Sequence, residues 1–391
     1  MVDQSLRIEP VQTNRDIEDF IRFPFKLYQG DPNWVPPLLS EQRKFLSPEG
    51  NPFFDHAEVA LWLARRNGEV VGTISSHIDH LHNQIHDEQI GMFGLFEMVE
   101  DYAVAEALLS TAREWVRERG MTALRGPLSF SQNHECVLLI DGFDGSPVVM
   151  MAYNPRYYID FYERFGLSKA KDLYAYIGDL AQFEGDPGKL PTKIVRVTEK
   201  VKKRTGIITR SADMKNYSEE IERAEQVYNQ AWEKNWGFVP LTDAEIEKLA
   251  ADLKQIIDPE LAVVAEINGE PIGVAIAIPD ANQVLKHLNG RLLPFGWIKA
   301  LWYARKVTGS RLLVLGVVQE YRGRGIEALL MFETLKAAVL NGYKSIELSW
   351  ILEDNDMMNR IILNTAEPYG THVYRTYRMY QMPVGVERSR E

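Results

Sequence analysis

The chain of 391 residues contains a single cysteine, Cys136, which excludes an intrachain disulfide and any metal site built from several thiolates. The apolar residues 137–140 that follow it predict a buried thiol rather than a nucleophile. No apolar run reaches the roughly 20 residues that a membrane-spanning helix needs. The first residues lack the pattern of a signal peptide, so we expect a cytoplasmic location and no integral membrane association.

Basic residues are also in deficit, with 44 Lys and Arg against 55 Asp and Glu and a formal net charge of −11. Because a nucleic-acid-binding protein needs a basic face, this balance argues against a nucleic-acid partner. The hydrophobic fraction of 45% and the charged fraction of 25% predict a folded globular protein. A chain this long exceeds what one hydrophobic core usually serves, so we expect two domains.

The two halves of the chain repeat the same elements in the same order. The matched features are Trp34 and Trp236, the hairpins at residues 59–74 and 261–276, and the strand–helix–strand segments at residues 91–128 and 312–350. Each hairpin has Asn-Gly at its turn, at positions 67–68 and 268–269, and this pair favours a type I′ turn. The repetition indicates a duplication. We expect an N-terminal domain at residues 1–180, a linker and basic helix at 181–204, and a C-terminal domain at 205–391.

A glycine-rich loop, Arg322-Gly323-Arg324-Gly325, lies in the second half between an apolar strand and a helix that we expect to begin at Ile326. The glycines permit a tight turn that exposes successive N–H groups, and the N-terminus of a helix attracts anions. The two guanidinium groups are suited to phosphate oxygens. The pattern therefore predicts a site for a ligand that carries phosphate.

This segment resembles the signature motif of the GNAT acyltransferase superfamily, Arg/Gln-x-x-Gly-x-Gly/Ala, and the resemblance covers most of both halves. It implies an α/β (α+β) fold of two tandem GNAT-like domains, each a mixed, mostly antiparallel sheet flanked by helices. It also implies acetyl-CoA or another acyl-CoA as co-substrate, and no metal. The cofactor contacts that the resemblance implies are Leu315, Val317, Val318, Arg322, Gly323, Arg324, Gly325, Ile326 and Asn355.

The motif has one departure, because its last position holds Glu327 where the family has Gly or Ala. A carboxylate about 4 Å from a pyrophosphate charge would repel it by about 4 kcal/mol at an effective dielectric constant of about 20. The two arginines offset this, or the side chain turns to solvent. In the N-terminal domain the equivalent loop, residues 97–102, has three acids and no glycine, so we expect no cofactor there. Tyr162 matches the family's general-acid tyrosine, but without a cofactor loop beside it we expect a packing residue.

The resemblance predicts an N-acyltransferase, of the acetyl type, acting on a small amine or a peptide amine. Trp232 and Trp236 are candidates for the acceptor site, although tryptophans that anchor a loop to the core give the same pattern. Glu233 and Glu353 are candidates for the base, since direct transfer needs a deprotonated nitrogen. Tyr374 is a candidate to replace the missing tyrosine of the C-terminal domain. The alternative is a non-catalytic GNAT-like module that binds CoA or a protein, and a homodimer is left open.

Two further segments have competing interpretations. Residues 77–86 hold four of the eight histidines, and their spacing matches no standard metal site, so we expect a solvated loop. Residues 292–306 are an insertion without a counterpart in the first half, helical from about Pro294 and rich in large apolar groups. We expect it to be buried between the two domains. The alternatives are a lid or acyl-chain wall, and a membrane-surface helix that carries Lys299, Arg305 and Lys306.

Overall fold

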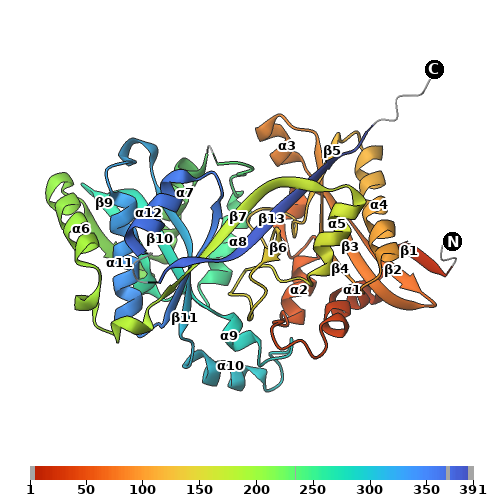
Figure 1. Ribbon diagram of the computed structural model, residues 1–391, viewed down its shortest axis with the longest axis horizontal. Helices are drawn as coiled ribbons and strands as arrows, with labels where there is room; N and C mark the ends of the chain where they lie inside the picture. The colour runs from red at the N-terminus through yellow and green to blue at the C-terminus, as the bar shows by residue number, and fades with distance from the viewer. Residues whose placement is uncertain (1–4, 234, 367–369, 386–391) are drawn as a thin grey trace. The chain divides into compact units, whose positions relative to one another are not determined.

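A computed structural model describes residues 5–233, 235–366 and 370–385 of the chain. The chain divides into two compact units (Figure 1). Unit 1 comprises residues 1–172, 285–300 and 376–391, and unit 2 comprises residues 173–284 and 301–375. The strands β7 (Ser168–Asp179) and β13 (His372–Pro383) therefore have residues in both units.

Unit 1 is built on a mixed sheet that is antiparallel except where β4 pairs with β5. Its strands, in sheet order, are β1 (Leu6–Pro10), β2 (Ala57–Arg66), β3 (Glu69–Asp79), β4 (Ile90–Met98), β5 (Ala123–Gly126) and residues 376–383 of β13. The short strand β6 (Leu138–Asp141) also pairs with β13. Residues 376–383 thus complete the sheet that begins with β1.

Helices cover both faces of this sheet. They are α1 (Asn14–Leu27), α2 (Leu39–Phe45), α3 (His80–His86), α4 (Tyr102–Glu118) and α5 (Tyr157–Phe165), with a 3-10 turn η1 (Pro52–Asp55). Trp62 of β2 packs in the core cluster that contains α4, whereas its neighbour Leu63 packs in the cluster that contains α1. Since successive side chains of a strand point to opposite faces, α4 and α1 lie on opposite faces of the sheet.

Unit 2 has the same plan. Its strands, in sheet order, are residues 173–179 of β7, β12 (Ser345–Leu352), β11 (Gly309–Val317), β10 (Glu270–Pro279), β9 (Ala262–Ile267) and β8 (Ile208–Ser211). Its helices are α6 (Thr192–Thr205), α7 (Tyr217–Trp232), α8 (Asp243–Leu253), α9 (Asn282–Leu285), α11 (Ile326–Leu340) and α12 (Asp356–Ala366). The 3-10 turns are η2 (Ala181–Phe183), η3 (Pro187–Lys189), η4 (Met214–Asn216), η5 (Pro259–Leu261) and η6 (Gln319–Tyr321).

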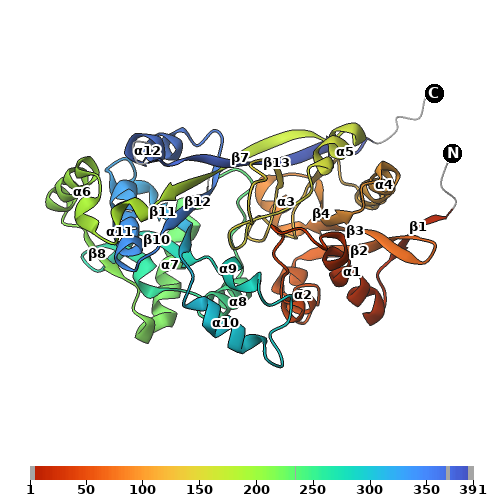
Figure 2. The ribbon, with the colours of Figure 1, turned by 60° about the horizontal axis from the view of Figure 1, so that its bottom comes forward.

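Helices also cover the two faces of the second sheet. A Cβ built on Gly273 of β10 would lie 2.9 Å from Leu330 of α11, and one built on Gly316 of β11 would lie 2.3 Å from Trp232 of α7. Helix α6 packs beside α11 (Figure 2), where Lys202 Nζ lies 2.6 Å from Glu333 Oε1. The basic helix expected before the second domain is confirmed as α6.

The predicted hairpins and their turns are confirmed. They are β2–β3 and β9–β10, and both turn residues have positive φ in each, 52° and 85° in the first and 52° and 86° in the second. Helices α4 and α11 follow β4 and β11, as the repeat predicts. The sequence did not predict the contribution of residues 285–300 and 376–391 to unit 1. The boundaries at residues 180 and 205 stay a prediction.

Two expectations were wrong. His77 lies in β3 and His82 in α3, and both side chains are buried, so the histidine-rich segment is not a solvated loop. The insertion forms α10 (Gly296–Ala304), whose large apolar side chains are exposed rather than buried. Apolar composition made burial the simplest expectation, but composition does not specify whether a neighbouring element covers a helix.

Candidate active site

Strands β11 and β12 begin as neighbours and then part. Residues 309–312 pair in parallel with residues 345–348. At the next residue β11 changes its register against β10, which makes Leu313 an extra residue, while residues 314–317 stay paired with β10. On the other side, β12 shifts its register against β7 after Leu348. Backbone groups of residues 313–317 that face away from β10 are therefore not paired with β12, although Val317 O accepts from Arg322 Nε, and we call this region the strand split.

The glycine-rich loop joins the end of β11 to α11. Gly323 has φ +71° and Gly325, the N-cap of α11, has φ +86°. Within the described residues, no side chain caps this terminus. A Cβ built on Gly325 would lie 3.0 Å from Val201 of α6. The first N–H groups of a 15-residue helix thus follow a turn that favours glycine, which is the geometry that attracts an anion.

The two arginines of the loop have different surroundings. Arg322 is half-buried; its Nε donates to Val317 O at 3.1 Å, and its Nη2 donates to Ala231 O. Arg322 therefore ties the loop to β11 and α7. Arg324 is exposed, with its guanidinium carbon 5.1 Å from the centroid of the Tyr321 ring. Of the two, Arg324 is the one placed to meet a ligand from solution.

Glu327 does not turn to solvent. Its side chain is buried in the first turn of α11, and its Oε1 has no hydrogen-bond partner among the described residues. A carboxylate here interacts favourably with the helix dipole. Its burial keeps the negative charge near the proposed phosphate site.

Helix α12 provides the second side of an open groove beside α11. The groove has a volume of about 610 Å³ and is lined by Ala328 of α11 and by Asp356, Met357, Arg360, Ile361 and Asn364 of α12. Asn355 precedes α12, and its Oδ1 accepts a hydrogen bond from Met358 N at 3.1 Å. The carboxamide oxygen of Asn355, the residue predicted to contact the cofactor, therefore caps α12, which leaves its NH2 group for a ligand.

The backbone predicted to meet the pantetheine is only partly available. Leu315 and Val317 lie in the part of β11 beyond the vertex of the strand split. Val318 N donates to Ile272 O at 2.9 Å, and Val318 O accepts from Tyr321 N at 3.0 Å. Both backbone groups of Val318 thus have partners within the protein, and Val317 O accepts from Arg322 Nε. Leu315 and the N–H of Val317 are therefore the stronger members of the predicted set.

Aromatic side chains from α7 cover the opposite face of β11. The Trp232 ring lies on Gly316, where any side chain would collide with it. Trp232 also packs on Tyr228, with ring centroids 4.7 Å apart, and Tyr228 packs on Phe238 at 5.3 Å. Trp232 is therefore at the strand split. Glu233 follows it and is exposed, and Trp236 is half-buried.

A buried ionic cluster that the sequence reasoning missed lies one residue before the vertex. Arg311 of β11 and Glu347 of β12 are register partners, with Nε and Oε2 3.4 Å apart. Ser349 Oγ donates to Glu347 Oε2 at 2.8 Å, while Glu347 Oε1 has no hydrogen-bond partner among the described residues. Burial raises the pKa of the Glu347 carboxyl to about 7, although the Arg311 and Arg375 guanidinium groups act in the opposite direction.

Two of the predicted residues remain, Glu353 and Tyr374. Glu353 is half-buried after β12, and Tyr374 is half-buried in β13, with the ring centroid 5.1 Å from the guanidinium carbon of Arg375. The centroid of the Trp350 ring lies 5.2 Å from the guanidinium carbon of Arg311. Of the residues predicted to be catalytic, Tyr374 has a chain neighbour in the cluster, and Glu233 lies beside Trp232.

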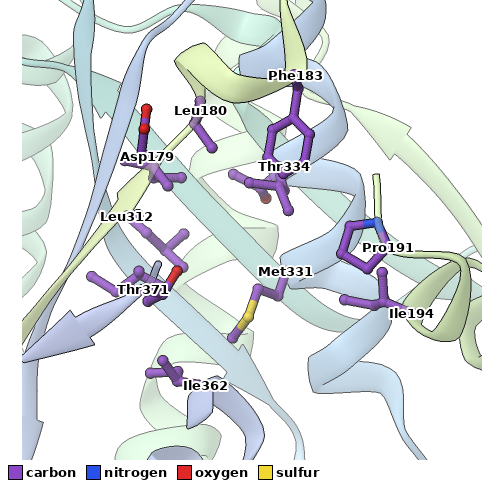
Figure 3. Close-up of a pocket in the computed structure, with 14 residues that line it drawn as sticks. Asp179, Leu180, Phe183, Pro191, Ile194, Leu312, Met331, Thr334, Ile362 and Thr371 are labelled. Atoms are coloured by element: carbon purple, nitrogen blue, oxygen red, sulfur yellow. The ribbon is translucent and has the colours of Figure 1, made fainter. Parts of the chain in front are cut away.

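A small apolar cavity lies on the α11 side of the vertex (Figure 3). Its volume is about 50 Å³, and Leu312 and Leu348, the last paired residues of the two strands, contribute to its wall. Met331 of α11, Ile194 of α6 and Ile362 of α12 point into the same space. The strand split thus has an apolar side at α11. Because neighbouring residues of a strand alternate, Arg311 and Glu347 lie on its other side.

The equivalent region of unit 1 is closed. Leu128 N donates to Phe93 O at 2.8 Å, and a Cβ on Gly94 would lie 1.6 Å from Leu128 O, so the chain itself follows β4 where β12 leaves β11 in unit 2. Glu97, expected in the loop, lies near the end of β4 and accepts hydrogen bonds from the hydroxyls of Tyr28 and Tyr158, both at 2.8 Å.

The structure also places the tyrosine that resembles the family's general acid. The Tyr162 side chain is fully buried, and its ring packs on Phe93 and Phe96. Burial raises the pKa of its hydroxyl far above the ordinary value. These surroundings are those of a core residue.

In the described part of the chain, no three or more His, Cys, Asp or Glu side chains are grouped so that they could hold a metal ion. Nor does any of the described helices have the length and apolar character to cross a membrane.

Comparisons with known proteins bear on the family and on the fold. Residues 221–361 match the family described as "Acetyltransferase (GNAT) family". The chain is 40% identical over 383 residues to "Bacterial ceramide synthase" of Caulobacter vibrioides (strain NA1000 / CB15N), covering 96% of this chain and 97% of that protein. It is 34% identical over 376 residues to "Protein YghO" of Escherichia coli (strain K12), covering 94% and 93%.

Solved structures of tandem proteins share the fold at low sequence identity. A tandem GNAT protein from the clavulanic acid biosynthesis pathway has a TM-score of 0.57 at 14% identity, covering 97% of this chain and 99% of that one. A GCN5-related N-acetyltransferase from Sphaerobacter thermophilus has a TM-score of 0.53 at 13% identity, covering 98% and 97%. The chain belongs to the GNAT acetyltransferase family, as a protein of two tandem GNAT-like units.

Proposed function

We propose that the protein transfers an acyl group from acyl-CoA to an amine, and that unit 2 binds the CoA. The observation that carries the proposal is the strand split of unit 2, which lies directly before a glycine-rich loop and a helix N-terminus. Unit 1 has neither an open split nor glycines in its loop, although it has the same order of elements. The two units therefore share one fold, and only in unit 2 do the two central strands part before a glycine-containing loop.

The CoA would run from the loop into the split. Its pyrophosphate would meet the N–H groups at Gly323, Gly325 and Ile326 and the guanidinium of Arg324, while Arg322 holds the loop in place. The pantetheine would pair with the backbone of Leu315 and with the N–H of Val317, since Val317 O accepts from Arg322. This arrangement supplies the anion site and the strand edge that a CoA thioester requires.

In the reaction the amine nitrogen attacks the thioester carbonyl, so that a C–N bond forms and the C–S bond breaks. The nitrogen loses one proton to a base, and the CoA sulfur leaves as a thiolate that takes up a proton. We propose Glu347 as the proton acceptor, because its pKa of about 7 suits a base at neutral pH and it lies next to the vertex on the side of Trp232. Glu233 and Glu353 stay alternative bases, and Tyr374 stays a candidate acid.

The name of the relative from Caulobacter vibrioides suggests the substrate class. A ceramide is the amide of a fatty acid with a long-chain amino alcohol. We therefore propose a long-chain amine as acceptor and a long-chain acyl-CoA as donor, in place of the small amine and the acetyl group that the sequence predicts. The apolar cavity beside Leu312 and Leu348 lies where the first carbons of an acyl chain would enter from the split.

Calorimetric titration with acetyl-CoA and with a long-chain acyl-CoA tests the binding, and thiol release in the presence of an amine panel tests turnover. We expect Gly325→Trp to abolish CoA binding. Gly342→Trp is the matched control, because Gly342 also has positive φ, +77°, but lies at the other end of α11. If the parent protein fails to bind either CoA ester, the proposed function is wrong.

The second candidate function is a non-catalytic GNAT-like module, and the buried charge of Glu327 at the loop is the observation that favours it. Binding of acyl-CoA without thioester loss for any amine in the panel would support it.

Among the base candidates, Glu347→Gln is expected to remove the rise in kcat through about pH 7, whereas Glu233→Gln and Glu353→Gln keep that rise.

A further inference from the structure

The insertion at residues 292–306 exposes an unusual amount of apolar surface. Half of the fourteen large hydrophobic side chains that are exposed in the described residues lie between positions 292 and 302. These seven are Leu292, Leu293, Phe295, Trp297, Ile298, Leu301 and Trp302, between 38% and 76% exposed. Scattered exposed apolar residues are normal, but a contiguous group of this size marks a binding surface.

Helix α10 has two distinct faces. Gly296, Ala300 and Tyr303, spaced four and three residues apart, are partly covered and form its inner face. The exposed group on the helix comprises Trp297, Ile298, Leu301 and Trp302. At about 100° per residue these four span an arc of about 140° on the side opposite the inner face. The apolar residues therefore form one outward stripe, which the loop residues before the helix extend.

The charge around this stripe differs from that of the whole chain. Residues 281–319 contain six Lys and Arg and no Asp or Glu, in a protein whose formal net charge is −11. Arg291, Lys299, Arg305 and Lys306 among them are exposed. Lys306 Nζ lies 3.2 Å from the centroid of the Trp302 ring, so a cation stands directly beside the apolar stripe. A local excess of positive charge selects a partner with a negative surface.

We propose that residues 291–306 are an interfacial segment that docks on a lipid bilayer containing anionic phospholipid. The apolar stripe would enter the boundary between head groups and acyl chains, the two tryptophans would lie at the head-group level, and the cations would meet lipid phosphates. A protein partner would also accept an apolar stripe. The exposed cations without acidic neighbours in sequence, together with the tryptophans, favour the bilayer. This inference rests on the proposed function in one respect, because a long-chain amine acceptor resides in the membrane.

Flotation with vesicles tests the proposal on the full chain. We expect binding to vesicles of phosphatidylcholine mixed with phosphatidylglycerol, and at least about tenfold weaker binding to phosphatidylcholine alone or in high salt. The variant Trp297→Ser/Trp302→Ser should lose binding to both kinds of vesicle. The variant Lys299→Gln/Arg305→Gln/Lys306→Gln should lose the preference for anionic vesicles. The matched control is Ile85→Ser/Leu340→Ser, which removes two apolar side chains of similar exposure elsewhere and should bind as the parent does.

Absence of parent binding to anionic vesicles, or equal binding by the tryptophan variant, would overturn the proposal. So would a parent dimer in sedimentation that the tryptophan variant converts to monomer without any effect of vesicles, since the stripe would then contact a second copy. Calorimetry with acyl-CoA separates the two levels. If the parent binds CoA but not vesicles, the membrane proposal alone is wrong. If the parent does not bind CoA, the proposed function is wrong.

Discussion

Arg322 and Arg324 stand two residues apart in one motif, and the structure separates their contributions. Arg322 donates to the carbonyls of Val317 and Ala231, so Arg322→Ala leaves the carbonyls of two buried residues without these donors. We expect a loss of about 1–3 kcal/mol in the free energy of unfolding, together with weaker CoA binding. Urea unfolding and calorimetry on the same sample measure the two effects.

Arg324→Ala should behave differently, because this side chain is exposed. The free energy of unfolding should stay within about 0.5 kcal/mol of the parent. CoA binding should weaken by about tenfold at low ionic strength and approach the parent's affinity as salt screens the contact. Equal destabilisation by both variants would contradict the assignment of Arg322 to the fold and Arg324 to the ligand.

The negative charge of Glu327 is expected to weaken CoA binding. Its buried carboxylate stands in the first turn of α11, where CoA phosphates would also lie. Glu327→Gln, which keeps the shape and removes the charge, should tighten acetyl-CoA binding by about tenfold, equal to about 1.4 kcal/mol. Glu320→Gln removes an exposed carboxylate from the same loop and is the control. Unchanged affinity of the Glu327 variant would show that this charge does not act on the ligand.

At the scale of elements, the sequence predicted those features that local chemistry determines. The Asn-Gly turns were predictable because both residues tolerate positive φ, and the loop after β11 was predictable from its glycines and arginines. The strand split was not, since the extra residue Leu313 is defined only by the pairing of β11 with two neighbours. Sequence patterns carry propensity, whereas the split depends on tertiary pairing.

The sequence around Glu347 contains a pattern that could have identified this residue. In residues 345–349 polar and apolar side chains alternate, which predicts a strand with one polar face. Such a face is usually solvated, but here it is buried against Arg311. A carboxylate in an alternating strand beside the cofactor motif is therefore worth testing as a site residue even when its surroundings are unknown.

The cluster around Glu347 makes stability depend on pH. Its folded pKa of about 7 lies above the ordinary value of 4.5, so its favourable contribution is complete below about pH 4.5 and is lost as the pH rises through about 7. Relative to Glu347→Gln, the parent should lose up to about 3 kcal/mol of unfolding free energy between about pH 4 and about pH 8, because this range includes both the ordinary and the raised pKa. His77, whose burial lowers its pKa to about 4, gives the opposite trend, so the difference between the two proteins is the quantity to measure. A constant difference across this range would contradict the burial of an ionisable Glu347.

At the scale of the whole molecule, the duplication has diverged in two ways. The units keep the same hairpin and the same strand–helix–strand order, and β4 and β11 both shift register against the preceding strand. Only unit 2 has glycines in its loop, and in unit 1 Leu128 pairs with Phe93 where the two strands of unit 2 part. The second divergence is in the chain path. Residues 376–383 belong to unit 1 and residues 173–179 to unit 2, so neither half of the sequence contains a whole unit. The repeat in the sequence could not reveal this exchange, because strands that swap between two similar units leave the order of elements unchanged.

Deletion of residues 376–391 tests this exchange. It would remove from unit 1 a strand that pairs with β5 from Tyr380↔Gly126 to Pro383↔Ala123, along with the fully buried rings of Tyr377 and Tyr380. Each such ring contributes about 3 kcal/mol or more when buried, so we expect unit 1 to unfold. Hydrogen exchange should then show loss of protection in β4 and α4 while β10 and α11 keep theirs. Tyr380→Phe, which removes only the hydroxyl, is the control and should preserve both patterns. Full protection of α4 in the shortened chain would show that unit 1 is complete without its last strand.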